Sequence, residues 1–368
     1  MRIVHLIWGF RIGGAEAMLA DIAGAQAEHH EVCIVVVNRD FDASLVAQVG
    51  TRVRLLVIDR PPGSGNPWHL LRLLRTLRRL RPDIIHAHEA SFSWLCRLVP
   101  VPVVLTVHNT RLSLGRGIDT FAEVFCISAA VQRDVHERSG RSGALVYNGV
   151  PFAAIPAKST YGGSPFRVVQ VGRLAHGQKG QDLLIQALRI VRERMPTVVV
   201  RVDFIGAGES LGHLESLARQ CNVSDECAFL GALPRAMVYE KLRDYDLLVQ
   251  PSRYEGFGLT VIEGIAAGLP VLVADIEGPR EILARGLRGW TFRSEDPDDL
   301  AARLAELIDA SREGSFGESM RAQIERARAL FDVSLTAQGY CEAYRRVTRV
   351  AGNSNKAGDA GIAAGGAA

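Results

Sequence analysis

Two glutamates, Glu255 and Glu263, lie in the segment PSRYEGFGLTVIE (Pro251–Glu263) in the pattern E-x7-E. The segment follows an apolar run that predicts a strand over Asp246–Gln250 and precedes an apolar run that predicts a helix. Glu263 and Thr260 share one helix face, because positions i and i+3 are neighbours on a helix. A carboxylate there can accept two hydrogen bonds from a vicinal diol such as a ribose. Glu255 precedes the helix and can bind a second polyol.

The backbone of the same segment is suited to a ligand. Gly256 and Gly258 let the chain approach a ligand closely, and the unpaired N–H groups of a helix beginning near Leu259 favour a phosphate. The structural alternative is one solvated glutamate and one helix-capping glutamate. The E-x7-E spacing alone does not decide between the two interpretations.

Two cations flank the end of another predicted strand, Phe166–Val171. Arg173 follows this strand in Gly172-Arg173-Leu174, and Lys179 precedes the next helix. A planar guanidinium and an ammonium can together bind a diphosphate and neutralise the charge on a departing nucleotide. The alternative is a pair of solvated surface cations, but the strand end favours the diphosphate site.

Alternating strands and helices must position these residues. Apolar, β-branched runs predict buried parallel strands, and helical patterns separate most of them. Such alternation indicates a parallel sheet covered on both faces. We therefore expect an α/β fold of two Rossmann-like, doubly wound domains that face each other across a cleft, with ligands at the carboxyl ends of the strands.

The expected domain boundaries follow composition. The stretch PFAAIPAKSTYGGSP has the prolines and glycines of a linker. The end of the chain is small and polar, which predicts a disordered tail. The expected parts are an N-terminal domain at 1–150, a linker at 151–165, a second domain at 166–333, a helix at 334–350 that packs back on the first domain, and a tail at 351–368.

Bulk composition excludes several classes of protein. The chain has 368 residues, 48% of them hydrophobic, and a net charge of +3 that is too small to argue for nucleic acid binding. No apolar run has the length of a membrane span, so we expect a cytoplasmic protein, or one peripheral on the inner face of the cell membrane. The six cysteines lack the spacing of a zinc site or a disulfide framework.

Two Asp-x-Asp strings are candidates for metal ligands. Asp244 and Asp246 stand at the amino end of a predicted strand, away from the expected site. Asp40 and Asp42 belong to the first domain, far in sequence from the donor motifs. We therefore expect neither string to bind a metal, and no divalent cofactor.

The stretch LLRLLRTLRRL (Leu70–Leu80) predicts a basic amphipathic helix. Its leucines are expected to pack inward, at positions Leu70, Leu73, Leu74, Leu77 and Leu80. Its cations are expected outside, at positions Arg72, Arg75, Arg78 and Arg79. Either this is an ordinary solvated face, or it contacts an anionic membrane surface.

Several motifs, in order, closely resemble the family 4 glycosyltransferases of the GT-B fold, also called group 1 glycosyltransferases. In the second half they are GRLAHGQKGQDLLIQAL, FIGAGE, FLG and PSRYEGFGLTVIEGIAAGLPVL. In the first half Gly13-Gly14 with Glu16, the histidine of LTVHN, and Asn148-Gly149-Val150 are similar to that family's landmarks. The resemblance extends to about Val350.

The resemblance implies that the domain at 1–150 binds the acceptor and that the domain at 166–333 binds the nucleotide-sugar. It also implies roles for individual residues. Arg173 and Lys179 would bind the donor diphosphate, Glu255 the 3- and 4-hydroxyls of the donor sugar, and Glu263 the ribose. His108 would face the transferred sugar and act in catalysis with Glu255, Arg173 and Lys179. The full set implied for donor binding is Gly13, Gly14, Gly172, Arg173, Lys179, Gly206, Leu230, Glu255, Phe257, Gly258, Leu259, Thr260 and Glu263.

The implied activity is a retaining, metal-independent transfer of a sugar from a nucleotide-sugar to a saccharide or lipid-linked acceptor, in bacterial-type cell-surface polysaccharide or glycolipid synthesis. Rivals of similar fold are a nucleotide-sugar 2-epimerase and a catalytically silent nucleotide-sugar-binding protein. One departure is Glu277-Gly278, where the family often has two glycines; it bears on donor specificity. The donor base, the donor sugar and the acceptor stay open.

Overall fold

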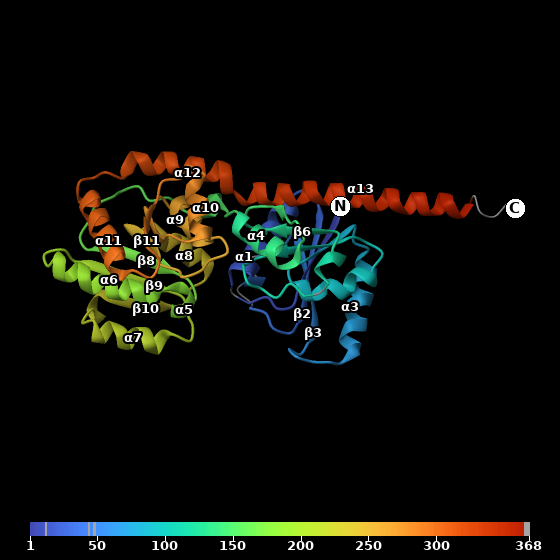
Figure 1. Ribbon diagram of the computed structural model, residues 1–368, viewed down its shortest axis with the longest axis horizontal. Helices are drawn as coiled ribbons and strands as arrows, with labels where there is room; N and C mark the ends of the chain where they lie inside the picture. Colours follow the sequence, from blue (N-terminus) through green and yellow to red (C-terminus); the bar gives the residue numbers. More distant parts are fainter. Residues whose placement is uncertain (12, 43–44, 47–48, 116, 364–368) are drawn as a thin grey trace. The chain divides into compact units, whose positions relative to one another are not determined.

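The computed structural model of the protein describes residues 1–11, 13–42, 45–46, 49–115 and 117–363 (Figure 1). The chain forms two compact units. The first is made of Met1–Gly149 together with the segment from Val333 onward, and the second is Val150–Asp332. Each unit is built on a parallel sheet with helices around it, as the alternation of strands and helices predicts.

The first unit has a doubly wound sheet. Its strands, in sheet order, are β3 (Val53–Arg60), β2 (Glu31–Asn38), β1 (Arg2–Ile7), β4 (Ile84–Ala87), β5 (Val103–Val107), β6 (Glu123–Cys126) and β7 (Ala144–Leu145). The strand order reverses direction between β1 and β4. In such sheets this switch point is where ligands bind, at the carboxyl ends of the strands.

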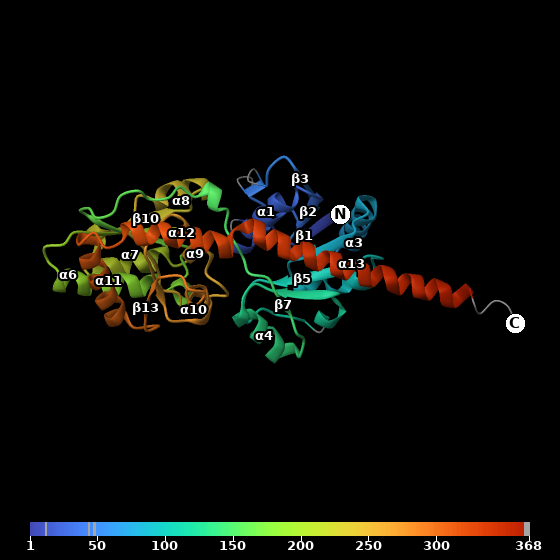
Figure 2. The same ribbon diagram turned by 90° about the horizontal axis from the view of Figure 1, so that it is seen from above.

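Helices complete the first unit. They are α1 (Gly14–Gln26), α3 (Pro67–Leu80), α4 (Ala129–Ser139) and α13 (Val333–Ala363), with the short 3-10 helices η1 (Ala90–Arg97) and η2 (Ile118–Thr120). Figures 1 and 2 show α13 as one long helix. It packs beside α1 and buries Tyr340 and Tyr344 completely. Positions i and i+4 share a helix face, which explains why both rings enter the same core.

Helix α13 is longer than the sequence predicts. A disordered tail was expected from Ala351, but the helix continues to Ala363. Alanines recur through this stretch, and extending an existing helix is far easier than starting one. The remaining predicted tail, 364–368, lies outside the described residues.

The second unit has its own doubly wound sheet. Its strands, in sheet order, are β10 (Cys227–Gly231), β9 (Val200–Ile205), β8 (Phe166–Val171), β11 (Leu247–Gln250), β12 (Val271–Ala274) and β13 (Trp290–Phe292). The switch point lies between β8 and β11. The surrounding helices are η3 (Phe152–Ala154), α5 (His176–Lys179), α6 (Gln181–Arg194), α7 (Leu211–Gln220), η4 (Ser224–Glu226), α8 (Arg235–Leu242), α9 (Leu259–Ala266), α10 (Glu277–Ala284), α11 (Pro297–Arg312) and α12 (Gly317–Phe331).

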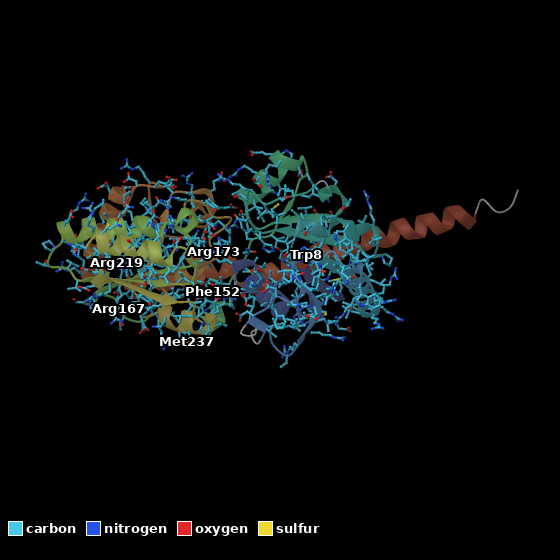
Figure 3. The ribbon with its side chains drawn as sticks, turned by 90° about the horizontal axis from the view of Figure 1, so that it is seen from below. Trp8, Phe152, Arg167, Arg173, Arg219 and Met237 are labelled. Atoms are coloured by element: carbon cyan, nitrogen blue, oxygen red, sulfur yellow. The ribbon has the colours of Figure 1, made fainter. Side chains whose placement is uncertain are left out.

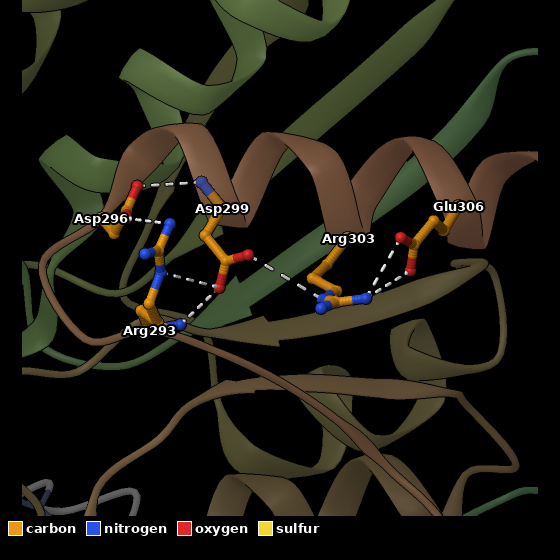
Figure 4. A network of polar contacts seen from close by, with 5 residues as sticks. All are labelled: Arg293, Asp296, Asp299, Arg303 and Glu306. Carbon is orange, nitrogen blue, oxygen red and sulfur yellow. Dashed lines mark hydrogen bonds and ion pairs between the residues drawn. The ribbon is translucent and has the colours of Figure 1, made fainter.

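Helix α11 shows how local polar contacts fix an element of this unit (Figure 4). The side chain of Asp296 accepts a hydrogen bond of 2.9 Å from the backbone N–H of Asp299, which caps the helix. Arg293 pairs with Asp296 at 2.8 Å, and Arg303 pairs with Glu306 at 2.9 Å. The capped helix packs along α6 and covers one face of the sheet.

The predicted linker at 151–165 packs onto the second unit. Phe152 and Ile155 are buried, and the backbone N–H of Lys158 donates to the carbonyl of Ala267 over 2.9 Å. The Lys158 ammonium pairs with Asp246 at 2.9 Å. The apolar residues among the prolines explain why this stretch is held against the unit.

The basic helix α3 differs in part from its predicted orientation. Leu73 and Leu77 are buried, as expected, whereas Leu70 is 39% exposed and therefore does not pack inward. Trp68 and Leu71 are also exposed. Helix α3 packs against β3, but the apolar residues of its first turn stay at the surface. Among the described residues, no helix is long and apolar enough to cross a bilayer.

Candidate functional site

The structure brings together Lys179 and Glu255. The Lys179 Nζ donates to Glu255 Oε2 over 2.7 Å, and Gln250 Nε2 donates to the same oxygen over 3.4 Å. Lys179 ends α5, which follows β8, while Glu255 follows β11. Because β8 and β11 are neighbours at the switch point, their carboxyl ends place the cation beside the carboxylate.

A glycine allows these two loops to touch. Gly180 has a φ of +65°, and a Cβ there would lie 1.9 Å from the carbonyl oxygen of Pro251. No side chain fits in that space, and the left-handed backbone favours glycine. The loop after β8 therefore lies directly against the start of the segment that carries Glu255.

Arg253 ties the same two loops together. Its guanidinium makes a bidentate pair with Asp182, at 2.9 and 2.8 Å, and donates to the carbonyl of His176 at 2.7 Å. Its backbone N–H donates to the carbonyl of Gln178 at 2.8 Å. The hydrogen bonds that Arg253 donates to Asp182 raise the pKa of the guanidinium. Sequence reasoning missed this pair, although both residues stand within the quoted motifs.

Glu263 lies on α9 and is 9% exposed. Its Oε1 accepts hydrogen bonds from the Tyr239 hydroxyl at 3.1 Å and from Arg235 at 3.4 Å. The Arg235 guanidinium also stands over the Tyr239 ring, 5.0 Å from its centre. Helix α8 thus orients the carboxylate. No spacing in the sequence indicates this contact, because β11 separates α8 from α9.

Arg173 is exposed at the end of β8 (Figure 3). Its guanidinium donates to Gln178 Oε1 at 3.1 Å, and its carbonyl accepts from Gln181 at 2.9 Å. The predicted clamp of Arg173 with Lys179 is thus built on one loop, with Arg173 at its solvent side and Lys179 at its half-buried side.

Backbone bonds join the other predicted donor residues of this unit. The N–H of Gly172 donates to Ile205 at 2.9 Å, and the N–H of Gly206 donates to Gly231 at 2.9 Å. These bonds align the ends of β8, β9 and β10. Leu230 lies on β10, while Phe257, Gly258, Leu259 and Thr260 lead into α9.

Three buried polar atoms of this segment lack a hydrogen-bond partner among the described residues. They are Gln250 Oε1, Ser252 Oγ and Thr260 Oγ1. Buried polar groups are nearly always paired in folded proteins. All three belong to the stretch 250–260, which contains Glu255, and they can pair with polar atoms of a ligand.

Gly278 lies against the backbone of the segment that carries Glu255. A Cβ at Gly278 would be 2.7 Å from the carbonyl oxygen of Glu255 and 2.8 Å from that of Phe257. Glu277, in contrast, is exposed. The chain thus departs from the family's two glycines at Glu277, where an exposed side chain has room. It retains the glycine at Gly278, where the backbones are in close contact.

The first unit carries the remaining predicted residues. His108 follows β5, and its Nε2 lies 2.9 Å from His88 Nδ1. Burial lowers the pKa of His108 to about 4, so the imidazole is neutral at pH 7. Gly13 is the N-cap of α1 and Gly14 its first residue.

A carboxyl group in the first unit also has an unusual environment. Glu89 follows β4, and burial raises its pKa to about 8, helped by the nearby charge of Glu16. Its Oε2 is buried without a partner among the described residues. Glu89 is therefore largely a neutral carboxylic acid at pH 7, at the carboxyl end of the sheet.

One cluster of side chains that could hold a metal ion occurs among the described residues. Three buried histidines, His5, His86 and His88, have ring nitrogens within 4.8 Å of one another. Of the aspartates in the two Asp-x-Asp strings, Asp246 pairs with Lys158 and accepts a hydrogen bond from the backbone N–H of Arg167, each at 2.9 Å. These contacts give Asp246 a structural role.

Comparisons with known proteins match this geometry. Residues 152–330 match the family model described as Glycosyl transferases group 1, and residues 12–153 match Glycosyltransferase Family 4. The chain is 31% identical over 328 residues to the D-inositol 3-phosphate glycosyltransferase of Jonesia denitrificans, covering 77% of this chain and 76% of that protein. It is 28% identical over 308 residues to the glycogen synthase of Mycobacterium tuberculosis, covering 75% and 72%.

A solved structure shares the arrangement. Anabaena HepE in complex with UDP and glucose has a TM-score of 0.77 at 20% identity, and the match covers 94% of this chain and 100% of that one. At this identity the likeness concerns the fold. It supports two Rossmann-like units of the GT-B type.

Proposed function

The chain belongs to the group 1, family 4 glycosyltransferases, and we propose that it moves a sugar from a nucleotide-sugar to a saccharide or lipid-linked acceptor with retention of configuration. The observation that carries the proposal is the contact of Lys179 with Glu255 at the switch point of the second unit. It joins a cation suited to phosphate and a carboxylate suited to sugar hydroxyls in one site.

In this proposal Lys179 serves both parts of the donor. Its ammonium has three donor hydrogens; one is directed to Glu255, which leaves the others for diphosphate oxygens. Glu255 then accepts hydrogen bonds from the 3- and 4-hydroxyls of the sugar. Glu263, fixed by Tyr239 and Arg235, accepts from the ribose hydroxyls.

The proposed reaction is same-face attack. The bond from the anomeric carbon to the diphosphate oxygen breaks, the acceptor oxygen bonds to the same face, and the departing phosphate oxygen takes the acceptor proton. Arg173 and Lys179 stabilise the negative charge on the leaving nucleotide, so that no divalent metal is needed. Neutral His108 faces the transferred sugar.

The acceptor class is proposed from two sources. The named activities of relatives include glycogen synthesis and transfer to inositol 3-phosphate, which are saccharide and phosphorylated polyol acceptors. The cations of α3, together with exposed Trp68, give a surface that suits an anionic membrane carrying a lipid-linked acceptor. Synthesis of cell-surface polysaccharide or glycolipid fits both.

One experiment separates this function from its rivals. Purified protein is incubated with UDP-, GDP- and ADP-sugars, with and without candidate acceptors and with EDTA, and nucleotide release and sugar products are measured. A retaining transferase releases the nucleotide when the acceptor is present. The glycosidic bond of its product has the same anomeric configuration as the sugar in the donor. An epimerised sugar without transfer would indicate the epimerase, and a donor that binds without nucleotide release would indicate a silent binding protein. Inversion of the anomeric configuration would contradict the retaining mechanism, and loss of activity in EDTA would contradict metal independence.

A further inference from the structure

A chain of hydrogen bonds connects histidines from three neighbouring strands of the first unit. His5 lies on β1, His88 follows β4 and His108 follows β5, in the sheet order β1-β4-β5. His5 Nδ1 lies 3.1 Å from His88 Nε2, and His88 Nδ1 lies 2.9 Å from His108 Nε2. At the other end, His5 Nε2 lies 2.8 Å from Gln26 Oε1. The chain thus runs from Gln26 to His108 without a break.

All three histidines of this chain are neutral at pH 7. Burial lowers the pKa of His5 and of His108 to about 4, and that of His88 well below its ordinary value. A neutral imidazole has one N–H and one lone pair. Since each link needs one donor and one acceptor, the tautomers are coupled: all three carry the proton on Nε2, or all three carry it on Nδ1.

Gln26 selects between the two arrangements. A carbonyl oxygen toward His5 requires an N–H on His5 Nε2, and the amide nitrogen then points to the other side of Gln26. The atom that lies 2.8 Å from His5 Nε2 is the amide oxygen of Gln26. The amide nitrogen is buried and has no hydrogen-bond partner among the described residues.

A second set of contacts lies beside this chain. The Tyr344 hydroxyl lies 2.5 Å from His86 Nδ1, and His86 Nε2 lies 2.7 Å from Thr106 Oγ1. Thr106 in turn donates to the Tyr340 hydroxyl at 3.1 Å. Each donor of this set meets an acceptor when Tyr344 donates to His86 and His86 donates to Thr106. The set is thus satisfied without His5, His88 or His108, whose tautomers depend on the Gln26 amide oxygen alone.

We propose that Gln26, His5 and His88 are positioning residues that hold His108 as its Nε2–H tautomer, so that His108 Nδ1 presents a lone pair. This Nδ1 is buried and has no hydrogen-bond partner among the described residues. An acceptor there suits the hydroxyl of a sugar. This use of the atom rests on the proposed function, in which His108 faces the transferred sugar.

A metal is the competing explanation for the cluster of His5, His86 and His88. Both ring nitrogens of each of these residues already lie within 3.1 Å of a hydrogen-bond partner. A zinc ion bound at about 2.0–2.1 Å from each nitrogen would have to break these bonds. The hydrogen-bonded arrangement therefore accounts for the cluster without an ion.

The tautomer can be observed directly. We would label the histidines of the full chain with nitrogen-15 and record long-range proton–nitrogen correlation spectra at pH 7.5 without ligand, assigning His108 by its loss in His108→Asn. The proposal predicts a protonated Nε2 and an unprotonated Nδ1 for His108. A protonated Nδ1 would overturn it, as would one equivalent of zinc in the purified protein.

Variants at the far end of the chain test the coupling. Gln26→Glu keeps an acceptor toward His5, so His108 should keep its tautomer. Gln26→Met removes the acceptor, and His108 should become a mixture of tautomers; Gln220→Met on exposed α7 is the matched control. A His108 signal that is unchanged in Gln26→Met would overturn the proposal. If Gln26→Met does not fold, the wild-type and Gln26→Glu spectra still decide.

Activity separates this inference from the proposed function. Gln26→Met should lower kcat about tenfold, with the KM for the donor changed less than about twofold, and Gln26→Glu should restore most of kcat. A purely structural role would lower the melting temperature and leave the His108 tautomer unchanged, which contradicts the inference. If the predicted tautomer is found but His108→Asn transfers sugar normally, the hydrogen-bond chain stands and the proposed role of His108 fails.

Discussion

At the scale of single residues, steric contact makes Gly278 a sensitive position of the proposed donor site. A methyl group there would press on the carbonyl oxygens of Glu255 and Phe257, at 2.7 and 2.8 Å. These are backbone atoms, so the whole segment must shift. We expect Gly278→Ala to weaken nucleotide-sugar binding at least about tenfold, measured by calorimetry. Gly212→Ala, where nothing lies within 4 Å, is the control; equal affinity in both variants would contradict the contact.

The pKa of Glu89 makes a second prediction at this scale. Because folding raises the pKa of Glu89 from 4.5 to about 8, the folded state holds a proton that the unfolded state releases over this range. The contribution to stability is therefore complete below about pH 4.5 and is lost as the pH rises toward 8.

Glu89→Gln should remove this loss, since glutamine resembles the neutral acid. The melting temperature of the variant relative to wild type should increase between pH 5 and pH 8.5, by an amount corresponding to roughly 4 kcal/mol. Glu28→Gln, at an exposed position of the same unit, is the control. A constant difference between variant and wild type across this pH range would show that Glu89 is ionised in the folded protein.

At the scale of elements, the site depends on how two loops are held. Arg253 connects the segment after β11 to α5 and α6 through Asp182 and two backbone carbonyl contacts. Lysine cannot make the bidentate pair. We expect Arg253→Lys to lower stability by about 1–3 kcal/mol and to reduce transfer more than nucleotide binding, as read by thermal melting and by kcat and Kd.

The exposed pair of Arg189 with Glu193 provides the matched comparison. Arg189→Lys should change stability by less than about 0.5 kcal/mol, because exposed ion pairs contribute little. If Arg253→Lys were equally mild, the bidentate pair would not hold the two loops.

Helix α3 carries the prediction about membranes. Its exposed arginines stand beside Trp68, which is 59% exposed. Reversing three charges, Arg72→Glu, Arg75→Glu and Arg79→Glu, should abolish co-sedimentation with vesicles that contain anionic lipid. The fold should be unaffected, because these side chains are at the surface.

The control for this variant reverses the same number of charges in the other unit, at the exposed positions Arg194, Arg219 and Arg243. It should still sediment with anionic vesicles. Equal loss in both variants would mean that net charge, and not α3, mediates binding. Failure of the wild-type protein to sediment would remove the membrane surface from the account.

The elements also show what sequence reasoning can and cannot give. The strands were predictable, because buried parallel strands are continuous apolar runs, and the glycine-rich motifs marked their ends. The exposure of Leu70 was not predictable, because helical periodicity identifies a face but not how much of it the sheet covers. The contact of Glu263 with Tyr239 likewise depends on the packing of α8 against α9.

At the scale of the whole molecule, the chain passes between its two units twice, after Gly149 and after Asp332. The two crossings are adjacent: the N–H of Val150 donates to the carbonyl of Phe331 at 2.8 Å. The first unit is completed only by α13, whose Tyr340 and Tyr344 fill its core. Helical periodicity predicts a helix there. The hydrogen bonds of these two tyrosines, however, are to residues more than 200 positions away in the sequence.

The central claim is that the second unit binds a nucleotide-sugar through two separate carboxylates, with Glu255 for the sugar and Glu263 for the nucleotide. The most direct measurement compares nucleotide affinity and sugar transfer in Glu255→Gln, Glu263→Gln and the exposed control Glu193→Gln. Glu255→Gln should lose transfer by at least about a hundredfold and bind the nucleotide within about threefold of wild type. Glu263→Gln should lose nucleotide affinity. Normal transfer by Glu255→Gln, or equal loss of nucleotide affinity in both site variants, would contradict the assignment.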